Sequence, residues 1–172
     1  GSEMCIRDSY WGEYGSSGGI MVWNSDLHIA HNHFLNNKAY AGGGLYVYSG
    51  STGLIERNLF IGNDNIQQDT HEVHSRAVRL QLSGNNQDEV LKFYNNTLYT
   101  NSEWDYNGTG WRTLRVNGNS PQVRIVNNIV ATSDNTPSAI YAENYPLIMY
   151  NLSESYIDGG FDTWGIQNSQ QP

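Results

Sequence analysis

Aromatic, arginine and amide side chains alternate with apolar ones in several short stretches of this chain. The aromatic and polar members of these stretches are Trp23, Tyr46, Tyr48, Arg79, Gln81, Arg115, Tyr141 and Glu143. If the stretches are β-strands, alternation places these side chains on one outward face. Flat aromatic rings can stack on sugar rings, while arginine and glutamine can donate hydrogen bonds to hydroxyl groups and carboxylates. We therefore expect a carbohydrate-binding face, with the plain alternative that these residues are simply good strand formers.

Glycoside hydrolysis is not expected on this face. A glycosidase needs two carboxylates about 5 to 9.5 Å apart across the bound sugar. Glu143 is the outward acid, and no outward acidic residue is evident one or two strands away from it. A hydrolase is therefore disfavoured.

Two polar segments carry side chains that could bind a metal ion. The first contains the histidine pair His71 and His74, with Glu72 beside it. No further ligand follows this pair at a spacing typical of metal sites. The second contains Glu103 and Asp105, whereas calcium takes about six to eight oxygen ligands. We therefore expect no metal site and no cofactor, with calcium as the one ion left open.

The elements that must position these side chains are short strands that recur along the chain. Five asparagines mark equivalent positions, 26, 38, 32 and 23 residues apart: Asn32, Asn58, Asn96, Asn128 and Asn151. The residues three positions before them are Ile29, Ile55, Phe93, Ile125 and Ile148. The residues two positions after them are Phe34, Phe60, Leu98, Val130 and Ser153. Five positions after the first three stand Asn37, Asn63 and Asn101.

A second apolar strand precedes each of these blocks. Its first and third residues are apolar while the middle one varies, as in Ile20-Met21-Val22, Leu45-Tyr46-Val47, Leu80-Gln81-Leu82, Leu114-Arg115-Val116 and Ile140-Tyr141-Ala142. A period of two indicates a strand with one buried face. Because one such unit has no core of its own, the units must stack and bury their inward residues against one another. The sequence thus predicts an all-β solenoid of about five coils.

Asparagine and glycine have separate expected roles at the corners of these coils. Equivalent residues of neighbouring coils lie ~4.8 Å apart, so the recurring asparagines can hydrogen-bond to one another as a ladder. Asparagine also tolerates the left-handed backbone conformation that a corner can require. Residues 42–44, all glycine, are expected to give the backbone freedom to turn into the next strand.

Composition excludes several classes of protein. Asparagine occurs 21 times and glycine 18 times, only 15% of the residues are charged, and the net charge is −8. A nucleic-acid-binding protein would normally carry a basic patch, and none is evident. The single Cys5 rules out an internal disulfide, and no apolar run approaches the ~20 residues of a membrane span.

The glycine and asparagine motifs resemble those of a known repeat family. FLNN at 34–37 and FIGN at 60–63 are similar to repeats of right-handed parallel β-helix proteins, above all the chlamydial polymorphic outer-membrane proteins, whose GGAI resembles GGGL at 42–45. The family also includes pectate lyases, polygalacturonases and tailspikes. The tail from Tyr150 to Asn168 resembles the end of β-helix domains in secreted bacterial proteins. The resemblance spans roughly residues 18–160 and implies a right-handed parallel β-helix, secreted or on the cell surface.

The catalytic signatures of that family are largely missing. Polygalacturonases carry Asn-Thr-Asp, Asp-Asp and Gly-His-Gly, and none of these occurs here. Pectate-lyase-like enzymes combine calcium-binding carboxylates with an arginine or lysine base, for which Arg79 and Arg115 are the candidates.

Three functions stay open. The first is a non-catalytic module that contacts polysaccharide, the second a fragment of a polysaccharide lyase acting on an acidic glycan, and the third an adhesin or spacer stalk with no small-molecule site. The resemblance does not decide among them, because fold alone does not fix chemistry. Since the catalytic signatures are largely missing, we expect a binding module rather than an enzyme.

Both ends of the sequence look truncated. Residues 1–9 have no strand period, and MCIRDS at 4–9 resembles translated adapter sequence at the edge of a metagenomic fragment, so we expect a non-native leader there. Residues 10–172 are expected to form a single β-helix domain. Coils left open at the ends would favour end-to-end self-association.

Overall fold

The computed structural model describes residues 5–7, 17–65, 75–82, 90–100, 112–118, 123–132, 138–142, 147–153, 156–158, 161–162 and 166–167.

Parallel strands form three sheets, named A, B and C in the order in which the chain repeatedly enters them. Sheet A consists of β2 (Ile20–Trp23), β6 (Leu45–Tyr48), β10 (Ser75–Leu82), β13 (Arg112–Gly118), β16 (Ser138–Ala142) and β19 (Tyr156–Asp158). Sheet B consists of β3 (Asp26–Ala30), β7 (Thr52–Glu56), β11 (Leu91–Tyr94), β14 (Val123–Val126), β17 (Leu147–Met149) and β20 (Phe161–Asp162). Sheet C consists of β1 (Cys5–Arg7), β4 (His33–Leu35), β8 (Leu59–Ile61), β12 (Thr97–Thr100), β15 (Ile129–Thr132), β18 (Leu152–Ser153) and β21 (Ile166–Gln167). A short fourth sheet pairs β5 (Lys38–Ala39) with β9 (Asp64–Asn65).

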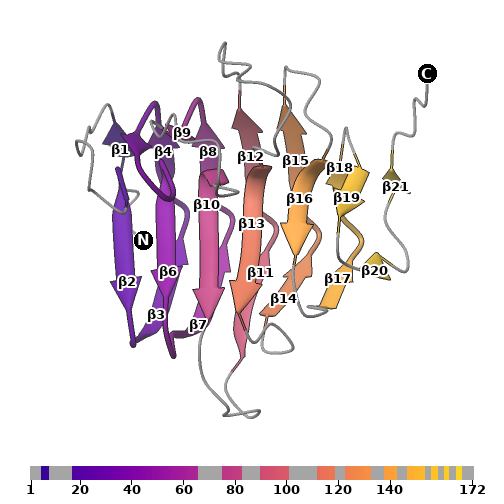
Figure 1. Ribbon diagram of the computed structural model, residues 1–172, viewed down its shortest axis with the longest axis horizontal. Coiled ribbons are helices and arrows are strands. Elements are labelled where there is room, and N and C mark those ends of the chain that lie inside the picture. Colours follow the sequence, from indigo (N-terminus) through magenta and orange to yellow (C-terminus); the bar gives the residue numbers. More distant parts are fainter. Residues whose placement is uncertain are drawn as a thin grey trace.

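One strand from each of sheets A, B and C makes one coil of a parallel β-helix, which confirms the predicted all-β solenoid. Strand order in space follows strand order in sequence, as the colours advancing from β2 to β18 show (Figure 1). The described strands complete six coils, the sixth being β19, β20 and β21, whereas the sequence indicated about five. The sixth was missed because its block lacks the asparagine that marks the others.

The N-terminal segment that the sequence analysis leaves out of the fold contributes one strand. Cys5, Ile6 and Arg7 of β1 pair in parallel with His33, Phe34 and Leu35 of β4. The non-native origin of residues 1–9 is independent of this pairing and stays a prediction.

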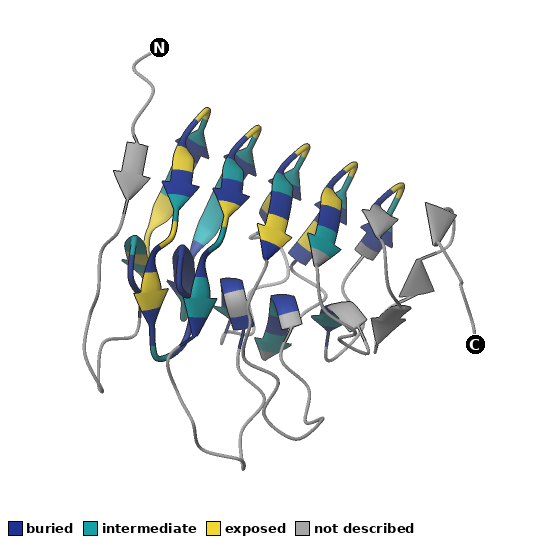
Figure 2. Ribbon diagram, turned by 90° about the horizontal axis from the view of Figure 1, so that it is seen from above, coloured by how far each residue is buried: buried dark blue, intermediate teal, exposed yellow. Residues whose placement is uncertain are grey.

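The core is built from columns of inward side chains, and both predicted columns are confirmed. Ile29, Ile55, Phe93, Ile125 and Ile148 are in register and buried. So are Phe34, Phe60, Leu98 and Val130, with the Phe34 and Phe60 rings stacked at 4.4 Å. Buried and exposed positions alternate along the strands, as the colouring of successive coils shows (Figure 2). Each coil is therefore stabilised mainly by its neighbours.

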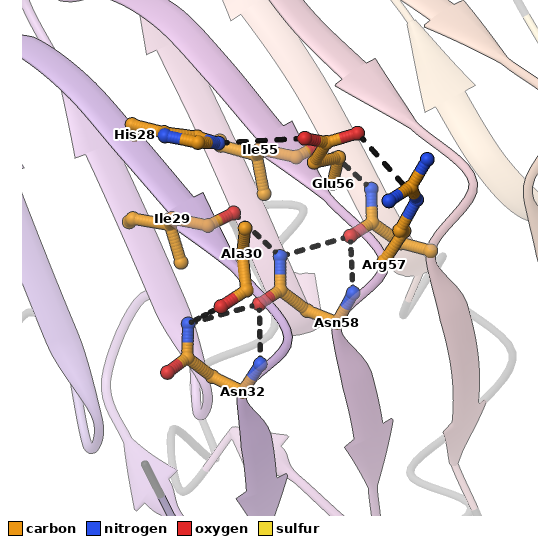
Figure 3. A network of polar contacts seen from close by, with 9 residues as sticks. His28, Ile29, Ala30, Asn32, Ile55, Glu56, Arg57 and Asn58 are labelled. Atoms are coloured by element: carbon orange, nitrogen blue, oxygen red, sulfur yellow. Dashed lines mark hydrogen bonds and ion pairs between the residues drawn. The ribbon is translucent and has the colours of Figure 1, made fainter. Parts of the chain in front are cut away.

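An asparagine ladder runs along the corner between sheets B and C, as predicted. The backbone N and the side-chain Nδ2 of each asparagine donate to Oδ1 of the next, at 2.8–3.2 Å, through Asn32, Asn58, Asn96, Asn128 and Asn151. Figure 3 shows the first step, with Asn58 Nδ2 also donating to the carbonyl of Ile29 at 2.9 Å. A second ladder joins Asn37 to Asn63, with Nδ2 donating to Oδ1 at 2.9 Å, while Asn101 lies outside the described residues. These amides satisfy buried backbone groups that the turn removes from the sheets.

The left-handed corner residue is not the ladder asparagine, which corrects one expectation. Positive φ values of 53–58° occur one position earlier, at His31, Arg57, Asn95, Asn127 and Tyr150. All five are exposed, and the chain turn that they make directs the following asparagine inward. Asparagine is therefore required for its amide, while the position before it accepts several residue types.

The triple glycine is explained by crowding rather than by backbone freedom. None of residues 42–44 has a positive φ. A Cβ atom on Gly43 would lie 2.5 Å from both the N and the O of Asp64 and 2.6 Å from the carbonyl O of Asn37. The neighbouring coil leaves no room for a side chain, so we conclude that close backbone approach fixes glycine here.

One predicted register in sheet A is displaced by two residues. Val78, Arg79 and Leu80 pair with Leu45, Tyr46 and Val47. The sequence pattern placed Leu80-Gln81-Leu82 at that level. Because a shift of two preserves the alternation, inward and outward faces are unchanged, but Arg79 now lies beside Tyr46.

Two isoleucines of one coil test the direction of the side chains. Ile55 is fully buried, whereas Ile61 is 37% exposed. We expect Ile55→Asp to abolish cooperative thermal unfolding, because an unpaired core carboxylate costs several kcal/mol out of a total stability of about 5–15 kcal/mol. Ile61→Asp should retain the sheet signal in circular dichroism and a cooperative melt. Similar melts for the two variants would contradict the inward column.

Asn58→Ala tests the ladder. The substitution removes the acceptor of two hydrogen bonds from Asn32 and the donor of bonds to Ile29 and Asn96. We expect a loss of about 1–3 kcal/mol in the free energy of unfolding for the polar groups left buried, measured by urea denaturation. Lys92→Ala, at an exposed position, is the control and should be near neutral. A loss at Asn58 no greater than that at Lys92 would argue against the ladder as a stabilising element.

Candidate functional site

The outward side chains of sheet A form two rows that run along the solenoid axis. The first, which we call the arginine row, contains Met21, Tyr46, Arg79, Arg115 and Tyr141, and the backbone pairing continues it to Asp158. The second, the tryptophan row, contains Trp23, Tyr48, Gln81 and Asn117. Neighbours within a row come from adjacent coils ~4.8 Å apart.

All but one of the candidate residues from the sequence lie in these rows. The exception is Glu143, which lies outside the described residues. The predicted set did not include Met21, Asn117 or Asp158. The first two could have been found by applying the period of two to every position of the strands, since Asn117 follows Arg115 by two residues. Asp158 belongs to the sixth coil, which the asparagine pattern does not mark.

Each arginine of the arginine row stacks on a tyrosine. The Cζ of Arg79 lies 5.4 Å from the ring centroid of Tyr46, and the Cζ of Arg115 lies 5.6 Å from that of Tyr141. Arg79 and Arg115 are themselves direct neighbours across the strand pair. Like charges placed opposite each other destabilise a sheet, while each cation–π contact contributes about 0.5–2 kcal/mol. The tyrosines therefore help the sheet to hold two guanidinium groups side by side.

Tyr46 lies mostly beneath the surface of this face and packs against the side chains that form it. Its side chain is only 7% exposed, and its hydroxyl donates to Oε1 of Gln81 at 2.8 Å. The ring of Tyr48 packs against it at 5.7 Å with a tilt of 52°. Burial raises the pKa of the Tyr46 hydroxyl, and the nearby positive charge of Arg79 lowers it in part. Among the described aromatic rings of the two rows, that of Trp23 is the most exposed, at 67%.

The two amides of the tryptophan row, those of Gln81 and Asn117, differ in their surroundings. Oδ1 of Asn117 is buried and accepts no hydrogen bond from any described residue. Oε1 of Gln81 accepts from Tyr46, so its Nε2 is directed away from that bond and can donate elsewhere. Because Oδ1 of Asn117 is buried, a molecule on this face would meet Nε2 of Gln81 rather than this oxygen.

No metal centre is found within the part of the chain that the structure describes. There, no three histidine, cysteine, aspartate or glutamate side chains come together as a metal site would require. The sequence candidates His71, Glu72, His74, Glu103 and Asp105 all lie outside that part.

No helix in the described ranges is long and apolar enough to cross a membrane. No protein-family model, curated protein or solved structure matches this chain.

The buried hydroxyl of Tyr46 gives a test of this geometry. We expect it to ionise above the ordinary tyrosine value of 10.0, because burial disfavours the phenolate. The difference between ultraviolet titrations of the wild type and Tyr46→Phe isolates this group. Above pH 10 the unfolded chain loses this proton while the folded chain keeps it, so this contribution to stability is intact below pH 10 and declines as the pH rises further.

The same pair of titrations in concentrated denaturant is the control. There the difference between wild type and Tyr46→Phe should show a tyrosine with its ordinary pKa. An unshifted difference curve for the folded protein would contradict the burial of this hydroxyl.

Proposed function

We propose that the outward face of sheet A binds polysaccharide and that the protein is a non-catalytic β-helix module of a secreted or cell-surface bacterial protein. The observation that carries the proposal is the tryptophan row, in which an exposed indole, a tyrosine and two amides follow one another in register. The cellular location rests on the resemblance of the glycine and asparagine motifs to secreted β-helix repeats.

The spacing of the rows suits a linear polymer. Side chains in register recur every ~4.8 Å along the solenoid axis, and a saccharide unit repeats on a similar length scale. A glycan lying along the axis would place one sugar over Trp23 and further sugars toward Gln81 and Asn117. Stacking on the indole provides apolar contact, and the Gln81 amide donates to a hydroxyl group.

The adjacent arginine row favours an acidic polymer. Guanidinium groups form paired hydrogen bonds with carboxylates, and Arg79 and Arg115 are held next to each other. The net charge of −8 repels polyanions at long range. Salt limits that range to ~8 Å at physiological ionic strength, so local arginines can still prevail.

Binding is favoured over a lyase reaction because the two row neighbours of the arginine pair, Tyr46 and Tyr141, are not carboxylates. Elimination requires a group that accepts a proton from the sugar ring. The backbone register continues the arginine row from Tyr141 to Asp158, two coils away from Arg115. The raised pKa of Tyr46 keeps its hydroxyl protonated, and a guanidinium group has no acceptor for a proton. Arg79 and Arg115 therefore fit the role of binding a carboxylate better than that of a base.

Affinity electrophoresis through neutral and acidic polysaccharides tests the proposal. Trp23→Ala should weaken retardation on every polymer that binds, by about tenfold in dissociation constant. Arg115→Ala should weaken it selectively on acidic polymers. Arg124→Ala removes an exposed arginine from the outward face of sheet B and is the matched control, with no change expected.

Ultraviolet detection of unsaturated products is run on the same samples. Unsaturated product that the wild type forms and Arg115→Ala does not would indicate a lyase rather than a binding module. Unchanged mobility on all polymers with no product would leave a spacer or adhesin stalk as the function.

A further inference from the structure

One hydrogen bond joins the two rows on the outward face of sheet A. The hydroxyl of Tyr46, in the arginine row, donates to Oε1 of Gln81, in the tryptophan row, at 2.8 Å. The two residues lie on neighbouring strands, β6 and β10, with Gln81 beside Tyr48 in the pairing. The orientation of the Gln81 amide is therefore set by a residue of the other row.

The Tyr46 hydroxyl is held in place by its surroundings. Only 7% of the residue is exposed, the Cζ of Arg79 lies 5.4 Å from the ring centroid, and the Tyr48 ring packs at 5.7 Å. Among the described residues, Oε1 of Gln81 is the acceptor of the hydroxyl proton. A reversed amide would leave that proton buried without an acceptor, which is strongly disfavoured. Burial therefore fixes which end of the amide faces Tyr46.

The end of the amide that is left for a ligand is a donor. With Oε1 bonded to Tyr46, the Nε2 of Gln81 faces away from that bond and carries two N–H donors. Its row neighbour Asn117 has a buried Oδ1, and a guanidinium group, as at Arg79, has donors only. Among the described side chains, the face around Gln81 thus offers N–H groups and no exposed amide or carboxylate oxygen.

We propose that Tyr46 is a positioning residue that makes this part of the face selective for a carboxylate over a hydroxyl group, because it holds Oε1 of Gln81 and turns Nε2 toward the ligand. The inference rests on the polysaccharide-binding function proposed above and assigns the specificity of that same site. A carboxylate accepts at both oxygens and forms charge-assisted hydrogen bonds about twice as strong as neutral ones. A hydroxyl group also brings a proton, for which the described amides of this face present no exposed acceptor.

Tyr46→Phe isolates this role because it removes the hydroxyl and keeps the ring. The ring contacts with Arg79 and Tyr48 involve groups that the substitution retains. The Gln81 amide can then turn, and the buried Oδ1 of Asn117, its partner in the strand pairing, offers an acceptor for Nε2. In that arrangement Oε1 would face the ligand and repel a carboxylate, although the formal charge of the protein is unchanged.

Nuclear magnetic resonance of the side-chain amides tests the orientation without a ligand. The Nε2 signals of Gln81 are assigned by their absence in Gln81→Ala. We expect them to shift more in Tyr46→Phe than in Tyr48→Phe, because the first variant removes the hydroxyl that Gln81 accepts from and the second removes a hydroxyl beside it. Equal shifts in the two variants would show that Tyr46 does not hold the amide.

Two pairs of polymers test the selectivity. They are polygalacturonate and alginate, each beside its fully methyl-esterified form, so that the members of a pair differ in the carboxylate alone. Affinity electrophoresis gives the ratio of the affinity for the acid to that for the ester. In Tyr46→Phe we expect this ratio to fall about tenfold, with binding of the ester retained. Tyr99→Phe removes a hydroxyl from the outward face of sheet C and is the control, with the wild-type ratio expected.

A second background separates positioning from a general loss of structure. In Gln81→Ala the ratio should already be low, and adding Tyr46→Phe should not lower it further, because Tyr46 acts through the amide. A purely structural role of Tyr46 would lower the affinity for both members of a pair, with or without Gln81. Circular dichroism checks that each variant folds.

The outcomes distinguish this proposal from the binding function on which it rests. A wild-type ratio in Tyr46→Phe, or an equal fall in the Gln81→Ala background, would overturn the positioning role and leave the binding function in place. Absence of binding to all four polymers would contradict the binding function and, with it, this selectivity.

Discussion

Every feature of this protein depends on coils staying in register, and the asparagine ladder is the interaction that holds that register at the corner. Where the chain turns from sheet B to sheet C, the backbone cannot pair as it does in the strands. The side-chain amides of residues such as Asn58 and Asn96 take over, each bonded to the next coil and to a backbone carbonyl of the previous one. Since these groups are buried, a coil that slipped would leave several polar atoms without partners. The ladder therefore disfavours slipped arrangements beyond what the apolar columns alone would do.

The candidate surface is a direct consequence of this register. Residues far apart in sequence, such as Arg79 and Arg115, become neighbours because their two coils stack in register. The chain can vary in length between coils, with 38 residues from Asn58 to Asn96 and 23 from Asn128 to Asn151, while the ladder spacing is kept. Sheet A thus brings together aromatic, amide and cationic side chains without any need for them to be close in sequence.

The parts of the structure that sequence could predict are those fixed by period and burial. Ile55 and Phe93 were identifiable as inward because large apolar residues are rare among polar neighbours, and the ladder because asparagine recurs at the same offset. The register of β10 could not be predicted, because Val78, Leu80 and Leu82 all fit the same alternation. Only the strand pairing shows that Val78 and Leu80 lie beside β6 residues Leu45 and Val47. The sixth coil was missed because no ladder asparagine marks it.

The candidate site was harder to predict than the fold for a related reason. Alternation along a strand predicts whether a side chain points inward or outward. How far an outward side chain is exposed depends on the side chains packed around it. Tyr46 points outward and is still 7% exposed, because Arg79 and Tyr48 pack against its ring. Asn95 and Asn127 each precede a ladder asparagine, and in such pairs only the structure shows that the first residue takes the left-handed conformation and the second donates the amide.

The ladder also gives the solenoid an electrical polarity. Each amide directs its Nδ2 toward the C-terminal coils and its Oδ1 toward the N-terminal ones, as the step from Asn32 to Asn58 shows (Figure 3). Strand peptide groups alternate in direction and largely cancel, but the stacked amides point the same way and their dipoles add. The two ends of the molecule are consequently unlike, with partial negative charge toward the first coil and partial positive charge toward the last. A growing or joining array of such coils would thereby have an intrinsic direction, much as the peptide dipoles of a helix do.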